Sequence, residues 1–151
     1  MKAYKHILIP TDGSALSLKA ARHAASLAKD LDAKVTAVYV TQPWMPPVAE
    51  ESLVVASYAY TEAAYRKRTD ASADKALAKV AKAAAGSRVR CEKLRIDASR
   101  PWQGIVKAAK DRKCDLIVMA SHGRSPLGGL VLGSETTNVL SHSRTPVLVC
   151  R

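Results

Sequence analysis

The stretch KHILIPTDGSALSLKAARHAASLAKDLDAKVTAVYVT, residues 5–41, decides the fold. It opens with an apolar run at 6–10, typical of a buried strand, and the turn residues TDGS follow at 11–14. Behind Ser14, a good N-cap residue, apolar side chains recur at helical spacing, namely Ala20, Ala24, Leu27, Ala28 and Leu31. The β-branched run at 33–41 predicts a second strand after a very short turn. A strand, a helix and a strand in succession indicate a parallel sheet.

The middle of the chain continues the alternation of strands and helices. The segment QPWMPPVAEES, residues 42–52, contains three prolines and predicts a loop. A long helix is expected over roughly residues 51–86, where Gly86 ends the run. The run RVRCEKLRI at 88–96 alternates charged and apolar residues, which favours a strand at the edge of the sheet.

The last third of the chain predicts two helices and two strands. A short helix follows Pro101, with an inner stripe of Trp102, Ile105, Val106 and Ala109. The unbroken apolar run DLIVMAS at 115–121 is typical of a strand buried on both faces. A helix at about 134–142 and a strand at 145–150 complete the chain.

These elements predict the fold class α/β, with an open five-stranded parallel sheet and helices on both faces, a Rossmann-like arrangement. The length of 151 residues suits a single domain, residues 1–151. In such sheets ligands bind beyond the carboxyl ends of the strands, where the winding direction reverses. That rule selects TDGS at 11–14, the region of Val40, and SHGRSPLGG at 121–129.

Composition predicts a cytoplasmic protein with no membrane partner. No apolar run approaches the roughly 18 residues that cross a bilayer, and Ile7–Ile9 is too short for a secretory core. The cysteines Cys91, Cys114 and Cys150 are odd in number and show no metal-ligand spacing, which fits a reducing compartment.

The net charge of +11 is concentrated in the middle of the chain. Residues 66–113 hold fifteen Lys and Arg against five Asp and Glu, whereas residues 1–65 hold six of each. Two interpretations are open. The excess could attract a polyanion such as a nucleic acid, or it could form solvated helix faces, which we favour.

The run from Ala120 to Ser134 carries the strongest indication of function. It ends a buried strand, is rich in glycine, and leads into a helix. Unpaired amides at a helix start, with the positive end of the helix dipole behind them, bind anions. Ser134 could donate to a phosphate, or it could be an ordinary cap behind a glycine-rich loop. The motifs GxxxxGK[ST] and GxGxxG are both absent.

The chain resembles the universal stress protein family. Nucleotide-binding members show Gly, two residues, Gly, nine residues, Gly, and then Ser or Thr. Here Gly123, the nine residues 124–132, and Gly133-Ser134 match that pattern, and Ala120 stands at the first Gly. If that position lies against the nucleotide, the extra methyl group would weaken binding. Other segments similar to the family are PTDGS at 10–14, DLIVMASHGRS at 115–125, LGS at 132–134 and TPVLVC at 145–150.

The resemblance implies a fold of the adenine nucleotide α-hydrolase-like kind and a site for ATP, ADP or AMP, with Mg²⁺ or Mn²⁺ as a candidate bridge between phosphates. It places Thr11 and Asp12 near the adenine and ribose, and Asp12 also near a metal-bridged phosphate. Asp in this position is also a common turn former, but we favour the ligand role. The residues expected to form the site are Pro10, Thr11, Asp12, Val40, Met119, Ala120, Gly123, Arg124, Gly133, Ser134, Glu135 and Thr136.

The implied roles differ along the site. Val40 would offer backbone hydrogen bonds to adenine, and Met119 and Ala120 would line the floor. The amides of Gly123 and Gly133 and the Ser134 hydroxyl would bind phosphates. The family resemblance does not imply a role for Arg124. Its position in the glycine-rich loop suggests a charge-assisted contact with a phosphate, or else it is a surface residue. Glu135 would either compete for the amides at the helix start or point into solvent.

The resemblance also implies a regulatory stress-response module that forms a homodimer through the last strand, Val147 to Cys150. No nucleophile with a placed general base is evident, because His122 has no Cys or acid beside it, so a dedicated enzyme is not expected. The alternatives are a stress protein without nucleotide affinity that acts through protein contacts, and a polyanion-binding protein that uses residues 66–113.

Overall fold

The computed structural model describes residues 3–46, 61–123 and 132–151. Five parallel strands form one sheet in the order β3-β2-β1-β4-β5, which confirms the predicted α/β class. The strands are β1 (His6–Pro10), β2 (Lys34–Thr41), β3 (Cys91–Asp97), β4 (Leu116–Ala120) and β5 (Val147–Cys150). The helices are α1 (Ala15–Asp30), α3 (Glu62–Gly86), α4 (Pro101–Asp111) and α5 (Ser134–His142).

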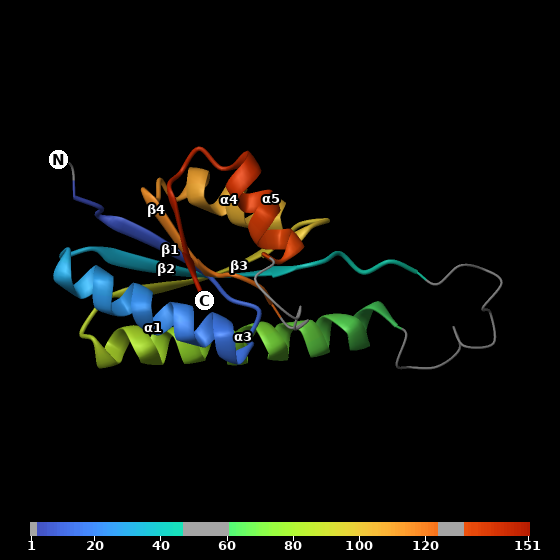
Figure 1. Cartoon of the computed structure of the whole chain (residues 1–151). Helices are drawn as coiled ribbons and strands as arrows, with labels where there is room; N and C mark the ends of the chain where they lie inside the picture. The colour runs from blue at the N-terminus through green and yellow to red at the C-terminus, as the bar shows by residue number, and fades with distance from the viewer. Residues whose placement is uncertain (1–2, 47–60, 124–131) are drawn as a thin grey trace.

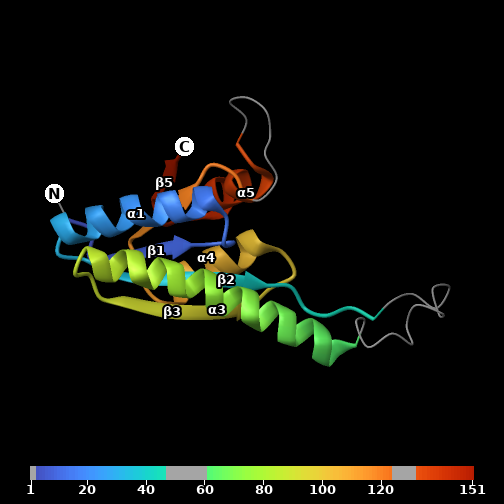
Figure 2. The same ribbon diagram turned by 90° about the horizontal axis from the view of Figure 1, so that it is seen from below.

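Helices cover both faces of the sheet. In Figure 1, α4 and α5 lie above the sheet and α1 and α3 lie below it. Figure 2 shows α1 and α3 side by side on the lower face. The chain winds from β1 to β2 and β3 on one side and then crosses to β4 and β5 on the other. The winding direction therefore reverses between β1 and β4, so a ligand crevice is expected beyond their carboxyl ends.

The core of the lower face is built from small and branched side chains. Helix α1 packs against β1 and β4, and its expected stripe is buried at Ala20, Ala24 and Ala28. Leu27 and Leu31 are half-buried at its border. Alanine has no side chain beyond Cβ, so α1 can approach the sheet closely. Ser14 is the N-cap of α1, as predicted, since its side chain accepts a hydrogen bond from Ser17 N.

On the upper face of the sheet, α4 packs on β1, β2 and β3, and α5 packs on β5 and against α4. Every residue of β4 is buried, as the apolar run predicted. In α4 the buried residues include Ile105 and Ala109, whereas the expected inner residues Trp102 and Val106 are only half-buried. Trp102 instead stacks on the ring of His142 in α5, with the ring centroids 4.3 Å apart. That stack joins the two helices along their outer side.

The boundaries of α3 and β3 differ from the expectation. The helix starts at Glu62 behind the N-cap Thr61, and the expected part at 51–60 lies outside the described residues. It ends at Gly86, but the residue in the left-handed region is Arg88, with φ 59°. Because Arg88 turns the chain there, β3 begins at Cys91 rather than at 88.

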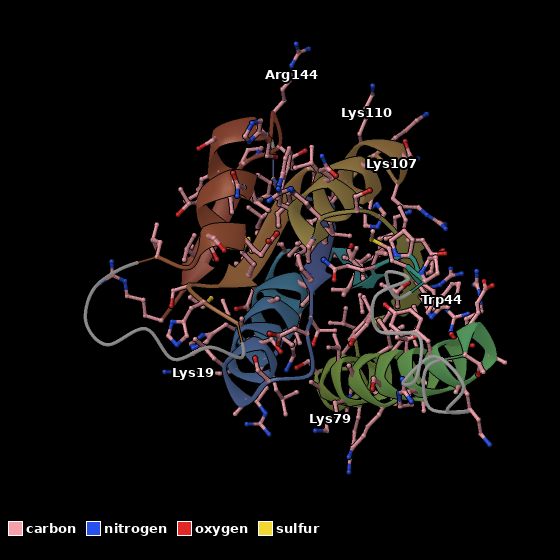
Figure 3. All side chains as sticks on the ribbon, turned by 90° about the vertical axis from the view of Figure 1, so that its right-hand side faces the viewer. Lys19, Trp44, Lys79, Lys107, Lys110 and Arg144 are labelled. Atoms are coloured by element: carbon pink, nitrogen blue, oxygen red, sulfur yellow. The ribbon has the colours of Figure 1, made fainter. Side chains whose placement is uncertain are left out.

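Basic side chains of residues 66–113 are distributed around the molecule. Figure 3 shows Lys79 of α3 pointing away on one side and Lys107 and Lys110 of α4 pointing away on the opposite side. Four ion pairs of the described residues each use a cation from this segment, among them Arg95 with Asp70 and Arg112 with Glu92. In the described part of the chain, no helix has both the length and the apolar character that a membrane span needs.

Candidate functional site

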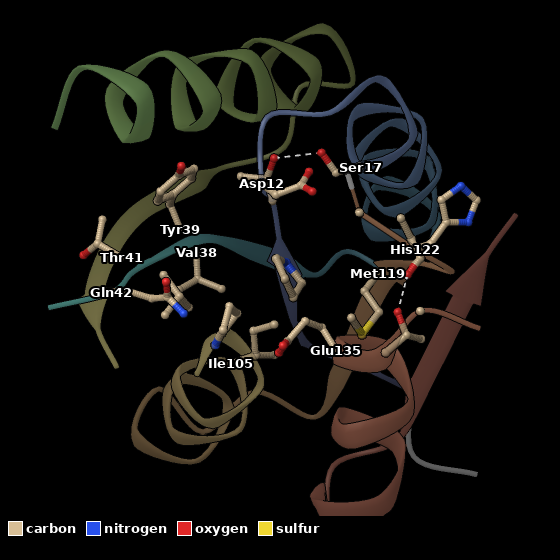
Figure 4. A pocket seen from close by; sticks show the side chains of 18 of the residues that line it. Asp12, Ser17, Val38, Tyr39, Thr41, Gln42, Ile105, Met119, His122 and Glu135 are labelled. Carbon is tan, nitrogen blue, oxygen red and sulfur yellow. Dashed lines mark hydrogen bonds between the residues drawn. The ribbon is translucent and has the colours of Figure 1, made fainter. Parts of the chain in front are cut away.

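A cleft of about 820 Å³ opens beyond the carboxyl ends of β1, β2 and β4. This volume is within the usual range for small-molecule sites. Every residue expected from the sequence to form the site lines the cleft, apart from Arg124, which lies outside the described residues. Figure 4 shows Asp12 and Ser17 on one side of the cleft, Tyr39 and Thr41 on β2 with Gln42 directly after it, and Glu135 at the start of α5.

The turn TDGS between β1 and α1 forms one wall and is held by its own hydrogen bonds. Thr11 Oγ1 lies 3.1 Å from Ser17 Oγ and accepts the Gly13 amide at 3.2 Å. Asp12 Oδ1 accepts the Ser14 amide at 2.9 Å. Gly13 has φ 83°, a conformation that favours glycine. Asp12 is therefore a turn former, which was one of its two predicted roles. Its carboxylate also lines the cleft, so the second role, a contact with a ligand, is compatible with its position.

Gly123 brings the second wall into contact with the first. A Cβ atom added to Gly123 would lie 2.6 Å from Asp12 Oδ2, closer than Cβ atoms come to other groups. A larger residue at position 123 would therefore displace the Asp12 carboxylate from its place in the cleft. Two segments that are far apart in the sequence thus meet in the lining of the cleft.

Val40 presents its backbone groups to the cleft. Along a strand, residues i and i+2 direct their amide and carbonyl groups to the same side. The carbonyl of Val38 faces β1, because it accepts the Thr11 amide at 2.9 Å. The pairing of β1 with β2 ends at Pro10 and Val38, so the backbone groups of Val40 face the cleft, past the last paired residue of β1.

The first turn of α5 supplies the amides of the site. Gly133 is the N-cap and makes no side-chain cap hydrogen bond. Its own amide donates to Ser121 O at 2.8 Å, so the expected phosphate contact from this amide does not fit the structure. Helix geometry leaves the next three amides, those of Ser134, Glu135 and Thr136, without a partner within the helix. These are the amides that an anion in the cleft can use.

Gly133 is also needed for close packing. An added Cβ would lie 3.1 Å from His122 Cα and 3.2 Å from His122 Cβ. The start of α5 therefore lies directly against the loop after β4. His122 lines the cleft, and its Nδ1 lies 3.1 Å from Ser121 Oγ.

Glu135 lies at the base of the cleft and links two helices. Its Oε2 accepts the Trp102 amide at 2.7 Å, so this side chain caps the start of α4. Arg100, the N-cap residue of α4, makes no side-chain cap hydrogen bond of its own. The expectation that Glu135 competes for the amides of its own helix, or points into solvent, is wrong. Its carboxylate is half-buried and bonds to another helix instead.

Met119 and Ala120 form the floor, where β4 ends. Ala120 is 7% exposed, and its carbonyl accepts Thr136 Oγ1 at 2.9 Å. Among the described residues other than glycine, positive φ angles occur at Asp32, Arg88 and Lys113, so Ala120 has a conformation that any residue can adopt. Alanine at the first position of the glycine motif adds a methyl group to the lining without straining the backbone. Thr136 itself is 2% exposed and holds α5 onto β4.

Several residues of the cleft were not predicted from the sequence. Tyr65 and Thr69 of α3 reach it from the side, and Tyr65 Oη donates to Gln42 O at 2.8 Å. Pro101 and Ile105 contribute from α4. No local pattern marks these positions, because they reach the cleft only when the helices pack on the sheet.

The described residues do not form a metal centre of their own. In residues 3–46, 61–123 and 132–151, no group of three or more His, Cys, Asp and Glu could hold a metal ion. A Mg²⁺ or Mn²⁺ ion at this cleft would need most of its ligands from a bound phosphate chain and from water.

Known proteins share both the sequence and the fold. The model of the Universal stress protein family matches residues 3–151. Universal stress protein MJ0531 of Methanocaldococcus jannaschii is 38% identical over 152 residues, which cover 98% of this chain and 82% of that protein. A universal stress protein of Thermus aquaticus is 32% identical, and the match covers 98% of this chain and 99% of that one.

Solved structures of this family superpose on the chain. The protein MJ0577 of Methanocaldococcus jannaschii has a TM-score of 0.77 and 28% identity, and 98% of this chain and 96% of that chain are covered. Two less similar structures share the fold. A universal stress protein in complex with cAMP has a TM-score of 0.71 and 24% identity, with coverage of 99% and 98%. The universal stress protein from Archaeoglobus fulgidus in complex with dAMP has a TM-score of 0.70 and 17% identity, with coverage of 99% and 100%. This chain belongs to the universal stress protein family.

Proposed function

We propose that this protein binds an adenine nucleotide in the cleft and acts as a stress-response regulatory module through occupancy of that site. One observation carries the proposal: the backbone groups of Val40 and the first-turn amides of α5 face the same cleft. The first can pair with the edge of a base and the second can bind phosphate. In this proposal the chain forms one cytoplasmic domain, residues 1–151, and has no dedicated catalytic residue.

The geometry supports one orientation of the nucleotide. The adenine lies against Val40, whose amide and carbonyl offer one donor and one acceptor to the base. The ribose lies near Asp12, and the phosphate lies at Ser134, Glu135 and Thr136. Of the helices that begin at the cleft, α1 is capped by Ser14 and α4 by Glu135. The start of α5 lacks a side-chain cap, which favours it as the anion site.

Relatives support the class of ligand. Two solved structures with this fold are complexes with cAMP and dAMP, both adenine nucleotides. ATP, ADP and AMP share their base and sugar-phosphate unit. If Mg²⁺ or Mn²⁺ accompanies a longer phosphate chain, Asp12 is the described carboxylate placed to approach it, because it lies against Gly123.

Calorimetry and thermal shift with AMP, ADP and ATP test the proposal, together with a matched pair of variants. Gly123→Ala places a methyl group against Asp12 Oδ2, so the affinity should fall by about tenfold or more. Gly86→Ala has nothing within 4 Å of the new Cβ and should leave the affinity unchanged. Absence of heat and of thermal shift at millimolar nucleotide would reject the proposal, and so would unchanged binding by Gly123→Ala.

A stress protein without nucleotide affinity is the second candidate, and Ala120 in the cleft floor is the observation that favours it. If its methyl group blocks the ligand, Ala120→Gly should create binding that the unaltered protein lacks. Tight binding by the unaltered protein, unchanged in Ala120→Gly, would eliminate this candidate.

The proposal includes a homodimer formed through β5. This strand is at the edge of the sheet, and Leu148 on it is 44% exposed. An edge strand with exposed apolar residues can pair with a second copy across a twofold axis.

A further inference from the structure

The charges around the cleft have the opposite sign to those of the whole chain. The net charge of the chain is +11. Among the described residues that line the cleft, however, the charged side chains are Asp12 and Glu135, and none is a Lys or Arg. Residues 124–131 are outside the described part of the chain. The described walls of the cleft thus carry negative charge and rely on backbone amides to attract a phosphate.

Glu135 lies directly where the phosphates are placed by the proposed function. Its backbone amide belongs to the first turn of α5, and the residue lines the cleft. Its carboxylate is therefore separated from an anion bound at that amide by no more than the length of the Glu135 side chain. The carboxylate is fixed rather than free to turn away, because its Oε2 accepts the Trp102 amide at 2.7 Å. The start of α4 favours a negative charge at that point, so the arrangement holds the charge in place.

A fixed negative charge discriminates between nucleotides by the number of their phosphates. AMP carries about two negative charges near neutral pH and ATP about four, so repulsion from Glu135 grows along that series. The described residues lining the cleft include no cation to offset the additional charge of a triphosphate. The α5 amides can serve one phosphate group as well as several.

We propose that Glu135 makes this cleft selective for adenine nucleotides with a single phosphate, the AMP class, over metal-free ATP. The inference rests on the proposed function, since it specifies the ligand of the same site. Glu135 is a specificity-determining residue in this view, and its contact with Trp102 holds its charge in position.

The test is calorimetry with AMP and ATP in the presence of a metal chelator, on the full chain and two charge variants. Glu135→Gln removes the charge but keeps an oxygen that can accept the Trp102 amide. Asp30→Asn removes one charge at the last residue of α1, about 24 Å along the helix from the cleft. The unaltered protein should bind AMP more tightly than ATP. Glu135→Gln should shift the ratio of the two dissociation constants toward ATP by on the order of tenfold, and Asp30→Asn should not.

The outcomes separate the inference from the proposed function. If no adenine nucleotide binds, the proposed function fails. If AMP and ATP bind but Glu135→Gln leaves their ratio unchanged, or Asp30→Asn shifts it equally, the selectivity assigned to Glu135 is overturned and the nucleotide site stands. Preference of the unaltered protein for metal-free ATP also overturns it.

A further variant distinguishes the charge of Glu135 from its capping role. Glu135→Ala removes both the charge and the acceptor for Trp102, so it should lower the melting temperature, whereas Glu135→Gln should not lower it appreciably. If the ratio of the AMP and ATP dissociation constants changes only in Glu135→Ala, the variant with the lowered melting temperature, and not in Glu135→Gln, loss of structure explains the effect. The inference is then wrong.

Discussion

Gly104 of α4 determines how closely this helix packs against β2 beside the cleft. A Cβ added to Gly104 would lie 2.7 Å from both methyl groups of Val40 and 3.3 Å from Ala98 Cβ. Val40 is in turn a lining residue of the cleft. The packing of one glycine therefore fixes a wall of the proposed adenine site, although Gly104 lies outside the family motif.

The first prediction concerns this contact. Gly104→Ala should destabilise the protein by about 1–3 kcal/mol, because either Val40 or α4 must move. Urea unfolding measures the change. Combining it with Val40→Ala, which removes the methyl groups in question, should recover part of the loss. Independent, additive effects of the two substitutions would contradict the packing argument.

The backbone conformation of Arg88 lowers the stability of the protein. Its φ of 59° belongs to the left-handed region, where a side chain is strained by roughly 1 kcal/mol and glycine is not. We predict that Arg88→Gly raises the free energy of unfolding by about 0.5–1 kcal/mol in urea titrations. Arg90→Gly, at a position that pairs with β2, should lower it. Destabilisation by Arg88→Gly would show that its side chain makes a compensating contact.

At the scale of elements, α5 is positioned by a buried hydrogen bond. Thr136 Oγ1 donates to Ala120 O, and Thr136 is 2% exposed. Thr136→Val keeps the shape but leaves that carbonyl without this donor, so stability should fall by about 1–2 kcal/mol. Thr137→Val, an exposed position that bonds within its own helix, should change stability by less than about 0.5 kcal/mol. Equal effects of the two substitutions in thermal unfolding would contradict the positioning role of Thr136.

The elements themselves were largely predictable, because their signals are local. The apolar run of β4, the alanine stripe of α1 and the cap at Ser14 depend only on neighbours within a few residues. Much of the site's lining was predictable from motif residues such as Asp12 and Gly123, which line the cleft.

Contacts between elements could not be predicted in the same way. Glu135 caps a helix that begins 34 residues earlier, at Pro101, and only the packing of α5 beside α4 brings the two together. The amide of Gly133 donates to Ser121 O because the start of α5 lies against the end of β4. Tyr65 reaches the cleft because the first turn of α3 lies beside the carboxyl end of β2, where Tyr65 Oη donates to Gln42 O. These contacts depend on how distant elements pack together, and local sequence patterns do not predict that packing.

At the scale of the whole molecule, His6 predicts how stability depends on pH. His6 is 6% exposed and its Nε2 lies 2.8 Å from Thr36 Oγ1. Burial, and next the positive charge of Lys34, lower the pKa of His6 below its ordinary value of 6.5. The unfolded chain therefore takes up a proton near pH 6.5, before the folded protein does. Stability from this group is complete above pH 6.5 and is lost as the pH falls below it.

Urea unfolding between pH 5 and 8 measures this dependence. His6→Gln, which cannot titrate in this range, should flatten the decline in stability below about pH 6.5. His23→Gln, at an exposed position, serves as the control and should keep the decline. An unaltered decline in His6→Gln would assign the pH dependence to other groups.

The oligomeric state is the second property of the whole molecule. Leu148 on the edge strand β5 is 44% exposed and Leu140 on α5 is 41% exposed. If β5 pairs with its copy, Leu148→Lys should convert a dimer to a monomer in sedimentation experiments, because charges at an edge oppose pairing. Tyr4→Lys, at another exposed apolar residue, should leave the dimer intact. A monomer in the unaltered protein, or a dimer that survives Leu148→Lys, would contradict the proposed interface.

The most direct test of the account is an amide-resolved NMR titration of the labelled protein with AMP. We predict that the amide signals of Val40, Ser134, Glu135 and Thr136 move together and saturably, because these groups face one cleft. The amide of Asp30, at the far end of α1, should remain in place. Saturable shifts confined to other residues, or no shift of the α5 amides at millimolar AMP, would contradict the claim that this cleft is the nucleotide site.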